Sequence, residues 1–219
     1  MDNISLFELE DTGVSNQEIV PLIIRELEEK YNNRFLVKCI GERYGTDTFD
    51  EATAYCSPIE NEKLVFTVKF DMIEEKLIDD DYYTKKNCFE LEENIEAGLK
   101  QNGIEALNKA EIFGKNKIDE DITVDEFSKK YTKANYISTI IIKNSQANKN
   151  LEDSFKYIRD KFEAINLKTL IYIIDENDYD IFAEQSKLVP YFSTTFIEKY
   201  NVIEKHNISV NKNQIIKIK

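Results

Sequence analysis

The segment Leu64-Val65-Phe66-Thr67-Val68-Lys69-Phe70 decides the fold of the first part of the chain. Its even positions are all apolar, whereas its odd positions carry Val, Thr and Lys. Alternation with a period of two residues indicates a β-strand that is buried on one face. Two more candidate strands precede it at residues 35–40 and 53–58, and the turn-rich residues 41–50 separate those two. Because the links are short, the sequence predicts a three-stranded antiparallel meander.

Helical periodicity flanks this meander on both sides. Residues 16–31 place apolar side chains at helical spacing, and Ser15 with Glu18 forms a capping-box pattern. Residues 79–102 return to the same spacing. Three consecutive carboxylates fall at the predicted start of this second helix: Asp79, Asp80 and Asp81. Since the positive end of a helix dipole attracts anions, one interpretation is that these carboxylates only stabilise the helix.

The second half of the chain alternates between strand and helix patterns. Residues 136–143 and 167–175 are apolar enough for buried strands, and the amphipathic residues 150–165 lie between them. This order predicts a helical crossover between two parallel strands. The other expected elements are short helices at 123–131 and 179–187 and closing strands at 192–200 and 208–218. The predicted fold class is α+β, with an antiparallel β-meander packed against helices and a smaller α/β unit after it.

A polar segment that begins with glycine, residues 114–121, is the predicted linker between the two parts. It separates an acidic helix–meander–helix module at residues 1–114 from an α/β unit at residues 121–219. One continuous domain with a shared sheet is the alternative.

The net charge of the chain is confined to its first half. Residues 1–120 carry 28 Asp+Glu against 14 Lys+Arg, a net of −14, while residues 121–219 carry 14 against 15, a net of +1. Nucleic-acid phosphates require a basic surface, so the charge argues against nucleic acid as a partner. A strongly acidic surface instead favours a cationic protein partner.

No sequence motif of a known catalytic site is present, and no cofactor is predicted. The single histidine, His206, lies between polar neighbours and is expected at the surface. Asp175, Asn177 and Asp180 follow a buried strand and resemble the start of a calcium-binding loop. Asp180 stands where that loop has glycine, so an ordinary solvated turn is the competing interpretation.

The three cysteines are Cys39, Cys56 and Cys88, and their odd number prevents complete pairing within one chain. Cys39 and Cys56 could pair across adjacent strands in an exported protein; otherwise all three are expected to be buried thiols. No apolar run approaches the roughly 20 residues of a membrane span. Residues 1–11 lack the basic and apolar parts of a signal peptide, so a cytoplasmic location is expected unless a leader has been removed.

The first half resembles a group of uncharacterised small proteins of Gram-positive bacteria that are often exported or lipid-anchored. The resemblance covers residues 31–98, about a third of the chain. It rests on Tyr31 and Phe35, Gly41-Glu42-Arg43-Tyr44-Gly45-Thr46, Thr53-Ala54-Tyr55, Pro58, Leu64-Val65-Phe66 and Asp80-Asp81-Tyr82. It implies a helix–meander–helix module without a known activity. The chain departs from the group because it has no leader or lipid-accepting cysteine near its start.

These patterns favour a non-enzymatic binding protein whose acidic surface engages a cationic protein partner. An immunity-type inhibitor of a toxin is the sharpest form of this hypothesis. The expected partner-binding residues are Asp79, Asp80, Asp81, Tyr82 and Tyr44. The alternatives are a divalent-metal-dependent enzyme that uses the acidic clusters and an envelope-associated structural domain.

Overall fold

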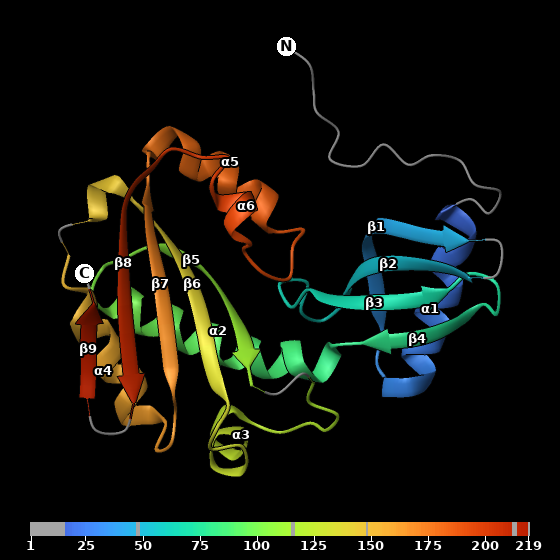
Figure 1. Ribbon diagram of the computed structural model, residues 1–219, viewed down its shortest axis with the longest axis horizontal. Helices are drawn as coiled ribbons and strands as arrows, with labels where there is room; N and C mark the ends of the chain where they lie inside the picture. The colour runs from blue at the N-terminus through green and yellow to red at the C-terminus, as the bar shows by residue number, and fades with distance from the viewer. Residues whose placement is uncertain (1–15, 47–48, 115–116, 148, 212–213, 219) are drawn as a thin grey trace. The chain divides into compact units, whose positions relative to one another are not determined.

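The chain folds into two compact units, Met1–Asp81 and Tyr82–Lys219 (Figure 1). The computed structural model describes residues 16–46, 49–114, 117–147, 149–211 and 214–218. The division falls earlier than the sequence predicted, because helix α2 (Tyr82–Gln101) packs against elements of the second unit. The second unit is therefore the larger of the two. Within the expected linker 114–121, Ile118 is buried in the core of the second unit.

The first unit contains a four-stranded antiparallel sheet in the order β1-β2-β3-β4. Its strands are β1 (Phe35–Thr46), β2 (Phe49–Pro58), β3 (Phe66–Asp71) and β4 (Lys76–Asp80). Helix α1 (Asn16–Tyr31) packs against β1 and β4. The predicted meander and its preceding helix are thus confirmed, and β4 adds a strand. Ser15, half of the expected capping box, lies outside the described residues.

The core of the first unit follows from the alternation in β3. Phe66, Val68 and Phe70 are completely buried, as are Ile23 and Leu27 of α1. The amphipathic helix and the apolar face of the strand therefore bury one another, which is the main source of stability for both elements.

Cys39 and Cys56 remain thiols, so the disulfide considered from the sequence is absent. The strand register pairs Cys39 with Tyr55 and Cys56 with Val37. Because neighbouring residues of a strand face opposite sides of a sheet, Tyr55 and Cys56 point in opposite directions. The two cysteines consequently lie on opposite faces. Burial raises the pKa of both thiols, which makes them poor nucleophiles.

The second unit contains a five-stranded mixed sheet in the order β5-β6-β7-β8-β9. Its strands are β5 (Ala106–Phe113), β6 (Asn135–Lys143), β7 (Leu167–Ile174), β8 (Val202–Asn211) and β9 (Gln214–Ile218). Its remaining helices are α3 (Val124–Lys130), η1 (Asn144–Gln146), α4 (Leu151–Lys161), α5 (Glu176–Ser186) and α6 (Thr194–Ile197). Only β6 and β7 run parallel, and α4 connects them, which confirms the predicted crossover.

Each face of this sheet packs against different helices. Residues of α2, α3 and α4 form one large apolar core with the sheet, and Figure 1 shows α2 and α4 together behind the strands. Residues of α5 and α6 form a smaller aromatic core with Ile141, Tyr172 and Ile174. Two cores on two faces make the second unit a three-layer arrangement.

The closing strand expected at residues 192–200 is wrong. This segment contains α6, which Ser193 caps by accepting a hydrogen bond from the N–H of Phe196. Phe192, Phe196 and Tyr200 are spaced four residues apart, which is the spacing of one helix face. All three contact Phe182 of α5, with ring centroids 5.0, 5.0 and 4.9 Å away. The second closing strand is confirmed as part of the pair β8 and β9.

Candidate functional site: the acidic hairpin of the first unit

The charge asymmetry persists when the charges are counted by unit. Residues 1–81 carry 20 Asp+Glu against 8 Lys+Arg, a net of −12, and residues 82–219 carry 22 against 21, a net of −1. Within the described residues of the first unit the count is 15 against 8, a net of −7. Nearly all the net charge therefore belongs to the smaller unit.

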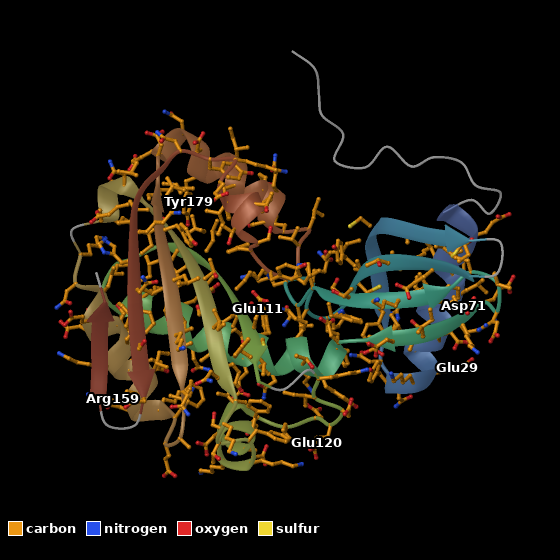
Figure 2. The ribbon with its side chains drawn as sticks, viewed as in Figure 1. Glu29, Asp71, Glu111, Glu120, Arg159 and Tyr179 are labelled. Carbon is orange, nitrogen blue, oxygen red and sulfur yellow. The ribbon has the colours of Figure 1, made fainter. Side chains whose placement is uncertain are left out.

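Exposed carboxylates gather where β3 turns into β4. We call residues 71–79 the acidic hairpin; its carboxylates are the half-buried Asp71 and the exposed Glu74, Glu75 and Asp79. Figure 2 shows Asp71 at the end of β3. Lys76 is the one basic residue in this segment, and it forms an ion pair with Glu74. Two isoleucines between these carboxylates are also exposed, Ile73 by 56% and Ile78 by 42%.

The turn of the acidic hairpin is built by local polar contacts. Asp71 Oδ1 accepts hydrogen bonds of 2.9 Å from the backbone N–H groups of Ile73 and Glu74. Such bonds from an Asp side chain to the following residues stabilise a tight turn. Glu75 then adopts a φ of 52°, in the left-handed region. The turn fixes the backbone while Glu74 and Glu75 remain exposed to solvent.

The three carboxylates predicted to bind a partner have separate roles. Asp79 is exposed on the acidic hairpin, but Asp80 is completely buried in its side chain. Asp80 accepts a 2.6 Å hydrogen bond from the ammonium of Lys30 and one of 2.5 Å from the hydroxyl of Tyr31. Asp81 accepts the backbone N–H of Thr67 at 2.6 Å. Asp80 therefore holds the unit together and is not open to a partner, whereas Asp81 is half-buried and positions the backbone of Thr67.

The sequence predicted helical spacing from residue 79, whereas the strand spacing continues to residue 80. Residues 79 and 80 belong to a strand, so their side chains alternate between solvent and core, and the helix begins only at Tyr82. Tyr82 is itself buried. The backbone of Tyr44 pairs with Glu51 in the sheet, whereas its side chain lies outside the described part of the structure.

Replacing the buried carboxylate tests its structural role. We expect Asp80→Asn to lower the free energy of unfolding by about 1–2 kcal/mol, because the amide weakens both charge-assisted hydrogen bonds. Urea denaturation followed by circular dichroism measures the change. The control Glu29→Gln removes an exposed carboxylate next to Lys30 and should change stability by less than about 0.5 kcal/mol. Equal effects of the two substitutions would contradict the assignment.

The residues proposed for a metal site form the start of a helix instead of a loop. Asp175 caps α5 and accepts a 2.9 Å hydrogen bond from the N–H of Asn177. Asp180 lies 3.4 Å from the ammonium of Lys143. Across the described residues no group of three or more His, Cys, Asp or Glu side chains could hold a metal ion.

His206 lies in β8 rather than in a polar tail. Its side chain is 15% exposed, and Nε2 is 3.2 Å from a carboxylate oxygen of Glu204.

Among the described helices none is long and apolar enough to cross a membrane.

Sequence reasoning found the acidity but missed the acidic hairpin. The available signal was the charged run Glu74-Glu75-Lys76 between the alternating strand of residues 64–70 and the apolar pair Leu77-Ile78. Asp is a residue that favours turns, and Asp71 directly follows the alternating strand.

Comparison with known proteins identifies a similar fold but no activity. Neither the models of protein families nor the curated proteins include a match to this chain. Among solved structures, the chain is similar to a DUF5037 family protein from Ruminococcus gnavus ATCC 29149, with a TM-score of 0.71 and 13% sequence identity. The similarity covers 90% of this chain and 92% of that one. The chain is therefore a mixed α+β protein, and at this identity the likeness extends to the fold alone.

Proposed function

We propose that the first unit is a non-enzymatic binding module that engages a cationic protein through the acidic hairpin. The observation that carries this proposal is the net charge of −12 on residues 1–81 against −1 on residues 82–219. A charge of this size on a small unit creates a field that attracts basic surfaces and raises association rates.

The composition of the acidic hairpin supports this role. The carboxylates of Glu74 and Glu75 would pair with Lys or Arg side chains at the rim of an interface. Ile73 and Ile78 would supply apolar area, which gives affinity that charge alone does not. The sharpest form of the proposal is an immunity-type inhibitor that covers the basic surface of a toxin. In this form the module acts in the cytoplasm, where the thiols of Cys39 and Cys56 would stay reduced.

Salt dependence and charge removal test the proposal together. The full chain is immobilised and used to capture proteins from the organism that encodes it, at about 50 mM and about 500 mM salt. A basic protein that binds at low salt and is lost at high salt is the expected result. Its affinity should fall roughly tenfold for the double variant Glu74→Gln/Glu75→Gln, because two rim charges are removed.

The matched control removes two exposed carboxylates from the second unit, as Glu152→Gln/Glu198→Gln. It changes the net charge by the same amount and should leave the affinity within about twofold. Binding that ignores salt, or that falls equally in both double variants, would contradict the role of the acidic hairpin. For the immunity form, the captured protein must be toxic when expressed alone and harmless when expressed with this chain.

A further inference from the structure

The outer edge of β5 is occupied by two charged side chains from α2. β5 is an outermost strand, and within the described residues it pairs with β6 alone. The backbone N–H of Ala110 donates to Oε1 of Glu92 at 2.7 Å, and the ammonium of Lys85 donates to the carbonyl oxygen of Ala110 at 3.0 Å. Both backbone polar groups of Ala110 therefore point away from β6 and are satisfied by α2.

This arrangement removes two ionisable side chains from water. Lys85 and Glu92 are both buried. Burial raises the pKa of Glu92, although Lys85, Lys109 and the Ala110 amide all favour its ionised form and only Glu96 adds to the increase. The ammonium of Lys109 lies 4.0 Å from the carboxylate of Glu92, and the desolvation of buried charges offsets much of their attraction. The apolar residues of α2 already fill the core, so the core does not need Lys85 and Glu92. We therefore explain these two side chains by the strand edge that they cover.

The pair occupies the positions of a neighbouring strand. In an antiparallel sheet, two residues of a hydrogen-bonded pair exchange N–H···O=C bonds in both directions. The carboxylate of Glu92 stands where a neighbour's carbonyl would accept, and the ammonium of Lys85 stands where its N–H would donate. Open strand edges recruit other strands, and proteins commonly block them with charged side chains.

The sequence of β5 shows which strand would fit the edge. Read antiparallel about Ala110, β5 is complementary to itself: Leu107 faces Phe113, Asn108 faces Ile112 and Lys109 faces Glu111. Each Lys–Glu pair would occur twice, and opposite charges across strands stabilise their pairing. Phe113, which is exposed in the single chain, would be covered by Leu107 of the other copy.

We propose that Lys85 and Glu92 guard the edge of β5 against a second copy of this chain, which otherwise pairs with it antiparallel and centred on Ala110. The Ala110 residues of the two copies then satisfy each other's N–H and carbonyl groups. This interface is two-fold symmetric and closes on itself, so its product is a dimer and not a fibre. Any displacement of the two side chains from the edge favours self-association.

Sedimentation equilibrium of full-length variants tests the proposal. Lys85→Met/Glu92→Met removes the donor and the acceptor but keeps long, helix-favouring side chains of similar volume, which limits the effect on folding. The wild-type chain is expected at 25.7 kDa and this variant at twice that mass. The matched control Glu92→Gln keeps a side-chain acceptor for the Ala110 N–H and should remain monomeric. A folded double variant that stays monomeric up to about 0.5 mM would overturn the proposal.

Charge reversal tests the register. Added to the double variant, Glu111→Lys places two lysines opposite each other and should abolish the dimer, and so should Lys109→Glu. An equimolar mixture of these two chains restores both opposite-charge pairs and should form only a heterodimer. A homodimer that survives Glu111→Lys would exclude pairing centred on Ala110.

Milder variants cover the case in which the double variant does not fold. Lys85→Met alone frees the carbonyl of Ala110 and Glu92→Met alone frees its N–H, so neither variant should dimerise by itself, whereas an equimolar mixture of the two should form a heterodimer. A folded mixture that keeps the mass of the monomer at about 0.5 mM counts against the proposal.

Discussion

The Phe182→Ala variant is expected to lose about 3–5 kcal/mol of the free energy of unfolding of the second unit. Phe182 is completely buried, and its ring contacts those of Phe192, Phe196 and Tyr200. It links α5 to α6 and to the segment between them. Removing it leaves a cavity among rings that are held by short local elements, and the geometric preference of the aromatic pairs is lost as well.

Chemical denaturation monitored by near-UV circular dichroism reports this loss, because the affected rings are aromatic. The matched control is Ile181→Ala, one residue earlier in the same helix, where the side chain is 54% exposed. That substitution truncates an apolar side chain that is exposed to solvent, so it should lower the free energy of unfolding by less than about 1 kcal/mol. A Phe182→Ala variant as stable as the control would show that the aromatic core does not hold α5 and α6 to the sheet.

The Gly98→Val variant is expected to destabilise the second unit by about 3 kcal/mol or more. A Cβ atom at position 98 would lie 2.7 Å from the backbone carbonyl oxygen of Ser154 in α4. Because that atom belongs to a helix backbone, it cannot move aside as a flexible side chain would. Glycine is thus required here by the close approach of α2 and α4, and valine adds two methyl groups to the clash.

Valine also lowers helix propensity, so the control must contain the same residue. Glu93→Val places valine on the exposed side of α2 and should cost under about 1 kcal/mol, from propensity alone. Thermal unfolding of both variants by circular dichroism separates the two effects. Comparable melting temperatures for Gly98→Val and Glu93→Val would mean that the two helices can separate at little cost.

The sequence predicts those elements whose burial follows one simple period. The alternating residues 64–70 and the helical stripe of residues 151–165 each pack against a single core, and both correspond to observed elements. The prediction failed where aromatic residues, which are common in strands, formed one face of a helical segment instead. In residues 192–200 the aromatic side chains suggested a strand, although their four-residue spacing matches the face of a helix.

The candidate site was predicted only in its charge. Net charge is additive along a sequence, so the acidic character of the first half needed no knowledge of the fold. Which carboxylates remain exposed depends on the strand β4, whose last two residues, 79 and 80, the sequence predicted as the start of a helix. Asp80 could not be separated from Asp79 by residue type; their difference comes from Lys30 and Tyr31, which precede Asp80 by 50 and 49 residues.

The early division of the chain bears on its biosynthesis. Every pairing in the first sheet joins strands that follow one another in sequence, so its contact order is low and its sheet is complete once Asp81 has been synthesised. The second sheet is complete only after β8 and β9, its last strands in sequence order, have been synthesised. On the ribosome the acidic unit can therefore fold first, while the strands of the mixed sheet are still emerging.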